Sequence, residues 1–232
     1  MKFILLLVVV GMFLACGWAD DSGTKPYSLD ILQKAQAGDP EAQFTLGESY
    51  YSGNGVKKDY QEAVRWVMKS AQQGNVKAQS GLGWLYENGI GVKQDEREAF
   101  SWYRSSAEQG DSDAQFRLGS CYRKGIGTAQ DHSEAIKWYI KSAEQGNKCG
   151  QKLLGLCVKD SEGGPQDNLE AAKLFKKLAE QGDSEAQYNL GICYDQGKGV
   201  GQNHSDAVKW FKKSANQGNT NAMEALEKLS SK

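Results

Sequence analysis

A glycine stands at every 36th residue over most of this chain. The five intervals between these glycines are identical, with no insertion or deletion; the glycines are Gly38, Gly74, Gly110, Gly146, Gly182 and Gly218. A fixed spacing of this size is typical of arrays of stacked structural repeats. In such arrays the core forms between neighbouring units, so 232 residues suffice for one continuous array.

The second half of each period predicts an amphipathic helix. Ala63, Trp66, Val67 and Ser70 follow the 3.6-residue spacing of a single helix face, and later periods repeat the pattern. An acid or amide precedes each of these helices, with a second acid three residues later, which predicts a capping box at the helix start. The residues that precede these helices are Asp59, Asp95, Asp131, Asp167 and Asn203. The glycine that recurs every 36 residues then supplies the left-handed conformation that ends this helix.

The first half of each period predicts another helix, here called helix A, and the second half is helix B. Ala42, Leu46 and Ser49 share one face of the first helix A, which ends at a pair of glycines, Gly53 and Gly55. Such a pair allows a tight turn, so helices A and B are expected to form a hairpin. The chain shows no sustained two-residue alternation, so no strands are predicted and the fold class is all-α. Residues 28–37 resemble the end of a helix B, and residues 219–232 read as a closing helix.

The units resemble the Sel-1-like repeat, a relative of the tetratricopeptide repeat. The shared pattern is A-x-Q-x-x-L-G-x-x-Y-x-x-G-x-G-V, followed by D-x-x-E-A-x-x-W-[YF]-x-x-S-A-x-Q-G, and it spans residues 38–218. The resemblance implies a right-handed α-solenoid of about five units, starting near residues 38, 74, 110, 146 and 182, within a domain of residues 28–232. The fourth unit departs most from the pattern, at Gly150, Val158, Ser161 and Leu174. There the same hairpin with looser packing is expected.

The resemblance also implies a binding surface, because helix A lines the concave groove in tetratricopeptide arrays. A protein or peptide partner is therefore expected on the residues of helix A that vary between units. These candidates are Phe44, Glu48, Tyr51, Trp84, Glu87, Phe116, Arg123, Lys152, Leu156, Lys159, Tyr188, Ile192 and Asp195. Large aromatic side chains and arginine are the usual energetic anchors of interfaces, which directs attention to Trp84 in particular. Such variation is equally what an unconstrained solvated face would show.

Two other function classes compete with a secreted or periplasmic scaffold. Some relatives carry a β-lactamase label, which suggests an enzyme acting on β-lactams or cell-wall peptides. Relatives in the endoplasmic reticulum suggest a chaperone-like part of an export or quality-control assembly. The near balance of 28 Lys and Arg against 29 Asp and Glu offers no electrostatic footprint for nucleic acid.

The first 19 residues resemble a signal peptide, followed by a flexible leader over residues 20–27. Lys2 precedes a nearly all-apolar run over residues 3–14, which is too short to span a bilayer. Cleavage before Asp20 is expected; Ala15-Cys16-Gly17 also permits cleavage before Trp18. A lipid anchor on Cys16 is a further reading, because residues 14–17 resemble a lipoprotein box. Secretion, the periplasm or, in a eukaryote, the endoplasmic reticulum lumen is therefore the expected location, with no transmembrane segment.

No catalytic, metal-binding or cofactor-binding residue is predicted. The only histidines, His132 and His204, both follow a cap residue at the start of a helix B and lie too far apart for one metal site. Ser22 and Lys25 match S-x-x-K, but they fall in the leader and lack the companion motifs of β-lactamases. Asn203 opens a glycosylation sequon, although its capping position already explains it.

Three cysteines of the repeats are expected to remain thiols. Cys121, Cys157 and Cys193 stand 36 residues apart, so they occupy equivalent positions on stacked helices. Helix axes lie about 8–10 Å apart, whereas the Cα atoms of a disulfide lie about 4.4–6.8 Å apart. Cys149 and Cys157 share one helix and are too far apart along it to pair.

Overall fold

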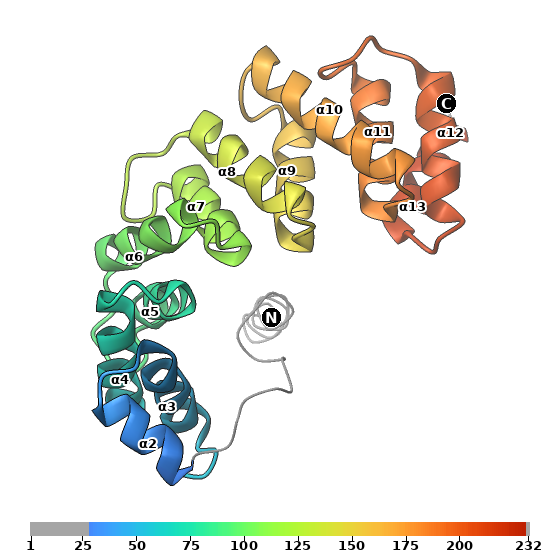
Figure 1. The fold of residues 1–232 in the computed structure, drawn as a ribbon. Coiled ribbons are helices and arrows are strands. Elements are labelled where there is room, and N and C mark those ends of the chain that lie inside the picture. The colour runs from blue at the N-terminus through green and yellow to red at the C-terminus, as the bar shows by residue number, and fades with distance from the viewer. Residues whose placement is uncertain (1–27, 231–232) are drawn as a thin grey trace, which may run out of the picture. The chain divides into compact units, whose positions relative to one another are not determined.

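The computed structural model describes residues 28–230; the predicted signal peptide, its cleavage sites and Cys16 lie outside this range. The chain divides between residues 129 and 130 into two compact units, here called the N-terminal and C-terminal units. Residues 28–230 form 12 helices and no strand, and consecutive helices within each unit pack against each other. This arrangement is that of an α-solenoid (Figure 1).

The N-terminal unit holds three helices A and three helices B. The first B helix is a partial one, and it is followed by alternating A and B helices: α2 (Leu29–Gln36), α3 (Pro40–Ser52), α4 (Tyr60–Gln72), α5 (Val76–Asn88), α6 (Glu96–Glu108) and α7 (Ser112–Lys124). The partial helix and its Ser28 cap confirm the expectation for residues 28–37.

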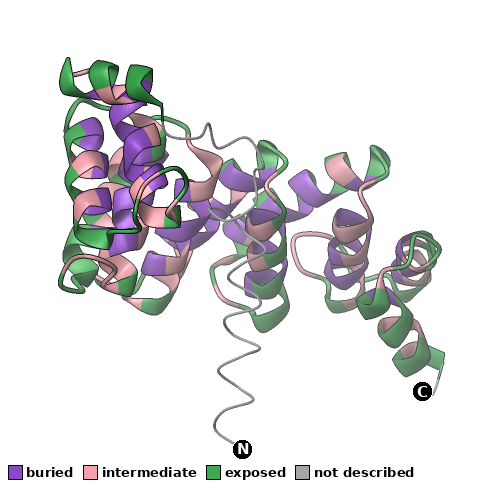
Figure 2. Ribbon diagram, turned by 90° about the horizontal axis from the view of Figure 1, so that it is seen from below, coloured by how far each residue is buried: buried purple, intermediate pink, exposed green. Residues whose placement is uncertain are grey.

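The C-terminal unit continues the alternation from a helix B. Its elements are α8 (His132–Glu144), α9 (Lys148–Asp160), α10 (Pro165–Glu180), α11 (Ser184–Gln196), α12 (His204–Ala215) and the closing helix α13 (Thr220–Ser230). Figure 2 shows buried residues on the helix faces that meet within each unit and exposed residues on the outer faces and turns.

The N-cap residues follow the sequence expectation, but the predicted capping box is wrong for α4, because the Asp59 N–H donates to the Tyr50 carbonyl at 2.9 Å and Glu62 pairs with Arg65 instead. The Asp59 carboxylate accepts hydrogen bonds from the backbone N–H groups of Gln61 and Glu62, which satisfies two donors at the start of α4. Gly74 has φ +87°, the left-handed conformation expected just after that helix. Each helix A is capped in the same manner, as by Asp39 at the Ala42 N–H in α3.

The start of α10 corrects one predicted cap. Asp167 is expected to precede this helix, but α10 begins at Pro165 with Gly164 as its N-cap. Proline is favoured in the first turn because that turn leaves its N–H groups without helical partners. The Asp167 carboxylate accepts hydrogen bonds from the Gly164 N–H at 2.8 Å and from the Ser133 hydroxyl at 2.9 Å. The residue is therefore a buried link between α8 and α10.

A helical glycine lets the α5–α6 and α11–α12 hairpins close tightly. A Cβ atom on Gly83 of α5 would lie 2.7 Å from the ring of Tyr103 on α6, and one on Gly191 of α11 would lie 2.5 Å from the ring of Phe211 on α12. Both rings are almost fully buried. The glycine in the Leu-Gly pair is thus required by the aromatic ring that lies against it.

The tryptophan positions of helix B lie at the edge of the core, although they share the helix face that contains the buried residues. Trp66, Trp102, Trp138 and Trp210 are half-buried, whereas the next residue in each helix is buried. In three of these helices a lysine lies over the indole ring, as with Lys69 at 4.0 Å from the Trp66 ring centroid. The column after tryptophan is the one that fills the core: Val67, Tyr103, Tyr139, Phe175 and Phe211.

Paired glutamines connect several hairpins to the preceding helix B. The Gln79 side-chain amide donates to the Ala71 carbonyl at the end of α4, and Gln109 donates to the Gln79 side-chain oxygen at 2.6 Å. The same pair recurs as Gln187 and Gln217 in the C-terminal unit. Because buried amides must be hydrogen-bonded, the glutamine column ties neighbouring repeats in one register.

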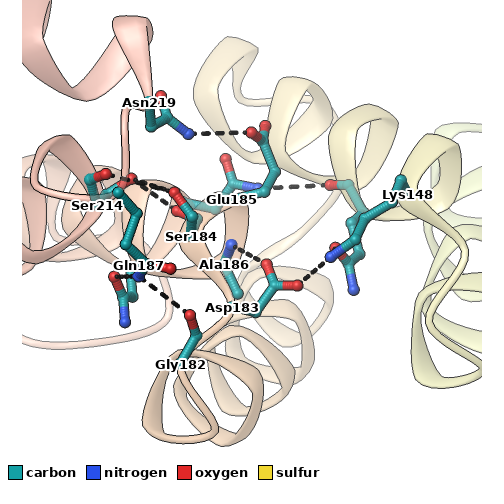
Figure 3. A network of polar contacts seen from close by, with 12 residues as sticks. Lys148, Gly182, Asp183, Ser184, Glu185, Ala186, Gln187, Ser214 and Asn219 are labelled. Atoms are coloured by element: carbon teal, nitrogen blue, oxygen red, sulfur yellow. Dashed lines mark hydrogen bonds and ion pairs between the residues drawn. The ribbon is translucent and has the colours of Figure 1, made fainter.

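Further polar contacts join α11 to its neighbours in the C-terminal unit (Figure 3). Asp183 caps the Ala186 N–H at 2.8 Å and pairs with Lys148 of α9. On the other side, the Asn219 amide donates to Glu185 at 3.2 Å. The fifth repeat therefore contacts the helices on both of its sides through side chains at the start of α11.

The fourth repeat differs from the others in how its helices approach. Gly150 replaces alanine because a Cβ there would lie 2.6 Å from the Ser142 hydroxyl oxygen on α8. The side chain of Asn189 occupies the space beside Gly155, and Leu174 is buried. Gly155 of α9 therefore lies against α11 and not against its hairpin partner α10, and α9 and α10 contact each other less than the paired helices of the other hairpins within the two units. This agrees with the predicted looser packing of the fourth hairpin.

Replacing Ser161 with glycine is expected to stabilise the protein by about 0.5–1 kcal/mol. Ser161 ends α9 with φ +62°, where the other repeats have glycine, and it is the one non-glycine residue with positive φ among the described residues. The left-handed conformation costs a residue with a Cβ about 1–2 kcal/mol, part of which the greater unfolded-state entropy of glycine offsets. Urea denaturation measures the change, with Ser161→Ala as the control that keeps the Cβ. A glycine variant no more stable than the alanine variant would contradict the prediction.

Candidate interaction surface

The predicted partner-binding residues all lie on A helices. The seven candidates of the N-terminal unit are distributed over α3, α5 and α7, and the six of the C-terminal unit over α9 and α11. Their role in binding stays a prediction, but their exposure can be compared with the sequence expectation. The two units are described separately below.

Three candidates are buried, so the expectation of exposed side chains is wrong for them. Phe44, Phe116 and Ile192 are 4%, 7% and 8% exposed. Phe44 belongs to a core cluster with Val64 and Leu82. These side chains therefore contribute to packing between neighbouring helices, which their column position alone did not reveal.

An aromatic cluster lies on the N-terminal unit between the first two hairpins. The Tyr51 ring meets the Trp84 ring edge to face at 5.8 Å and lies 5.5 Å from the Tyr60 ring. Tyr51 and Trp84 are half-buried against the core, whereas Tyr60 is 39% exposed. The Lys58 ammonium lies 4.7 Å from the Tyr60 centroid and 5.8 Å from that of Tyr51. We call Tyr51, Tyr60 and Trp84 the aromatic patch.

Tyr60 and Lys58 are members of this surface that the sequence analysis missed. They belong to the turn and the start of helix B, outside the helix A columns from which candidates were drawn. The available signal was the aromatic residue at position 60, which follows the cap where other repeats have Glu96, His132, Asn168 or His204.

Glu48 brings a carboxylate next to the patch, one helical turn before Tyr51 on α3. Burial raises its pKa from 4.5 to about 7, while the charge of Lys77 lowers it and that of Glu41 raises it. Burial likewise raises the pKa of Tyr51. The surface thus combines aromatic faces with a carboxyl group that titrates near neutrality.

Glu87 is held by its neighbours in the N-terminal unit. The Tyr103 hydroxyl donates to the Glu87 carboxylate at 2.5 Å, and the Arg117 guanidinium lies 3.7 Å from the same oxygen. Arg117 is itself buried and lies 5.7 Å from the Tyr103 centroid. This trio fixes Glu87 in place beside α7, and Arg123 lies further along that helix.

The C-terminal unit presents a different surface. Lys152, Leu156 and Lys159 are exposed on α9, and Leu156 is 37% exposed. On α11, Tyr188 packs against Phe211 with centroids 5.8 Å apart, and the Asp195 carboxylate lies 2.8 Å from Nδ1 of the His204 imidazole. This unit therefore offers basic and aliphatic groups without a matching aromatic patch on α9.

The described residues hold no grouping of three or more His, Cys, Asp and Glu side chains suited to a metal. His132 and His204 each stand at the start of a helix B, facing Glu162 at 3.5 Å and Asp195 respectively. Cys121, Cys157 and Cys193 are buried and make no disulfide, which confirms that expectation. Burial raises the pKa of Cys121 and Cys193 to about 12, so these thiols are poor nucleophiles at neutral pH.

Comparison with family models decides the identity of the repeats. The Sel1 repeat model matches five times, at residues 40–75, 76–111, 112–147, 150–183 and 184–219. The chain belongs to the Sel1 repeat family. Sel1 repeat proteins are protein-interaction scaffolds, in line with the surface above. Among curated proteins, none matches this chain.

Two solved structures of Sel1 repeat proteins are similar to this one. The first is c5321, a protective antigen present in uropathogenic Escherichia coli strains that displays an SLR fold; it is 38% identical with a TM-score of 0.71. The match covers 86% of this chain and 43% of that chain, so this chain spans less than half of that relative. The second is a Sel1 repeat protein from Oxalobacter formigenes, which is 33% identical with a TM-score of 0.68 and coverage of 86% and 88%.

No helix between residues 28 and 230 is both long enough and apolar enough to cross a bilayer.

Proposed function

We propose that the chain is a secreted or periplasmic, non-enzymatic adaptor that binds a protein or peptide partner on its A helices. The single observation that carries the proposal is the aromatic patch, in which Tyr51 and Trp84 meet at 5.8 Å on the exposed side of two adjacent hairpins. Large aromatic side chains on a rigid scaffold are the usual anchors of a protein interface. The family supports the class of function, since its members are interaction scaffolds.

The export part of the proposal rests on residues 1–19 and on the similar bacterial proteins, one of which is a protective antigen. The mature chain is expected to begin at Asp20, because a short apolar run and small residues precede that position. Intact mass spectrometry of exported protein measures the start. A lipid adduct on Cys16, or a soluble product that keeps residues 1–14, would contradict the prediction.

Replacing Trp84 with alanine is expected to weaken peptide binding by about 2 kcal/mol or more, which is the scale of an interface hot spot. The probe is a set of peptides enriched from a random dodecapeptide phage library on the mature protein and then synthesised. Calorimetry on each purified variant measures the affinity.

Trp102→Ala is the matched control for Trp84→Ala. Both indoles are half-buried and pack against the same core cluster, Trp84 from helix A and Trp102 from helix B. The two variants are therefore expected to lose similar stability, but only Trp84→Ala is expected to lose binding. Enriched peptides that bind both variants equally, or a library that yields no binder, would count against the proposed surface.

A further inference from the structure

The packing of the repeats does not explain why position 48 carries an acidic residue. Glu48 is half-buried on α3, and between residues 28 and 230 it makes no hydrogen bond or ion pair. A carboxylate that loses hydration without gaining such partners destabilises the folded state. The corresponding positions in the next two repeats are Trp84 and Ser120, so the repeat pattern does not require an acid there.

The neighbourhood of Glu48 suits a cation. Tyr51 follows one turn later on the same helix, and its ring touches that of Trp84. Within the patch, the Lys58 ammonium already lies over the Tyr60 and Tyr51 rings, a cation–π arrangement that a guanidinium group can also adopt.

We propose that Glu48, Tyr51 and Trp84 form a site for an arginine side chain of the partner. A guanidinium group can stack on an aromatic face while its N–H groups donate to a carboxylate, whereas lysine offers only a compact charge. The Glu48 carboxylate then gains the hydrogen bonds that it lacks in the free protein. The inference rests on the proposed function, since it names the residue type of the partner that the patch recognises.

Binding at this site is coupled to the ionisation of Glu48. Its carboxyl has a pKa of about 7 in the free protein, with Lys77 on α5 and Glu41 on α3 as the charges that act on it. A bound cation favours the ionised form and lowers this pKa, so binding releases a proton. Affinity is therefore expected to rise as the pH increases through 7 and to fall as the pH decreases from 8 to 6.

The test uses N-acetyl-arginine amide as the probe and its neutral isostere, N-acetyl-citrulline amide, as the control ligand. The indole N–H signal of Trp84, assigned by comparison with Trp84→Phe, is followed by NMR during titration at pH 6 and pH 8. We expect the arginine probe to bind about tenfold more tightly than the citrulline probe at pH 8, the scale of one hydrogen-bonded charge pair. The preference is expected to shrink at pH 6.

Glu48→Gln is expected to remove the arginine preference and its pH dependence. Glu96→Gln is the matched control, since it removes one negative charge from the exposed start of α6 and Glu96 is not among the charges that act on Glu48. Equal binding of both probes, no binding of either, or a Glu48→Gln variant that behaves like Glu96→Gln would overturn the inference. Peptides from the phage library that need Trp84 but contain no arginine would also overturn it while leaving the proposed function intact.

Discussion

Tyr103→Ala is expected to lower the free energy of unfolding of the N-terminal unit by about 3–5 kcal/mol, the usual range for removing a large buried aromatic side chain. The Tyr103 ring is completely buried between α5 and α6, against the Gly83 backbone. Its loss leaves a cavity and also removes the hydroxyl that donates to Glu87. Urea denaturation followed by circular dichroism measures the effect.

Tyr103→Phe separates packing from hydrogen bonding. It keeps the ring and removes only the hydroxyl, so a loss of about 1–2 kcal/mol is expected, as for one hydrogen bond to a charged group. If Tyr103→Ala costs no more than Tyr103→Phe, the ring does not carry the packing assigned to it.

Gly191→Val is expected to destabilise the C-terminal unit by about 3 kcal/mol, at the upper end of the usual cost of overpacking a core. The first added carbon alone would lie 2.5 Å from the ring of Phe211, which is 1% exposed and cannot swing into solvent. The branched side chain adds further atoms in the same direction. Thermal and urea denaturation measure the loss.

Two comparisons test the cause of that loss. Gln196→Val places the same side chain at the exposed end of the same helix, where only helix propensity changes, by less than about 0.7 kcal/mol. Combining Gly191→Val with Phe211→Leu makes room and is expected to cost less than the two single changes added together. Strict additivity would show that the glycine and the ring do not oppose each other.

The 36-residue period predicted the helices because the cap residues, the apolar spacing and the terminal glycines all indicate the same helix boundaries. Asp59 caps α4 and Gly74 ends it, as their residue types and spacing indicate. The same spacing identified the face on which Glu48 and Trp84 lie. Local chemistry that depends on neighbours in sequence could therefore be predicted well.

How far a side chain is buried could not be predicted in the same way. Phe44 and Phe116 share a face with the half-buried Trp84, yet both are buried because a neighbouring helix covers them. Conversely, the tryptophans of helix B lie at the edge of the core, beside lysines one turn away. Burial depends on the distance between helices, and this distance is set by contacts such as that between Gly83 and Tyr103.

The beginning of α10 was missed for a related reason. Asp167 has the residue type and spacing of a cap, but Pro165 favours an earlier helix start, and the Ser133 hydroxyl donates a hydrogen bond to the Asp167 carboxylate. The contact between Ser133 and Asp167 joins residues 34 positions apart. Sequence spacing within one repeat contains no information about it.

The paired glutamines restrict how this protein can change in length. The Gln79 side chain bonds to the Ala71 carbonyl of the preceding helix and to Gln109 of its own hairpin. Removing residues 76–111 as a block would join Asn75 to Ser112 and give Gln115 the carbonyl of Ala71 in place of that of Ala107. Removing any other number of residues from a helix would turn a buried amide away from its acceptor. Insertions and deletions within the helices are therefore tolerated as whole repeats, which makes the 36-residue unit the natural step by which such a chain lengthens or shortens during evolution.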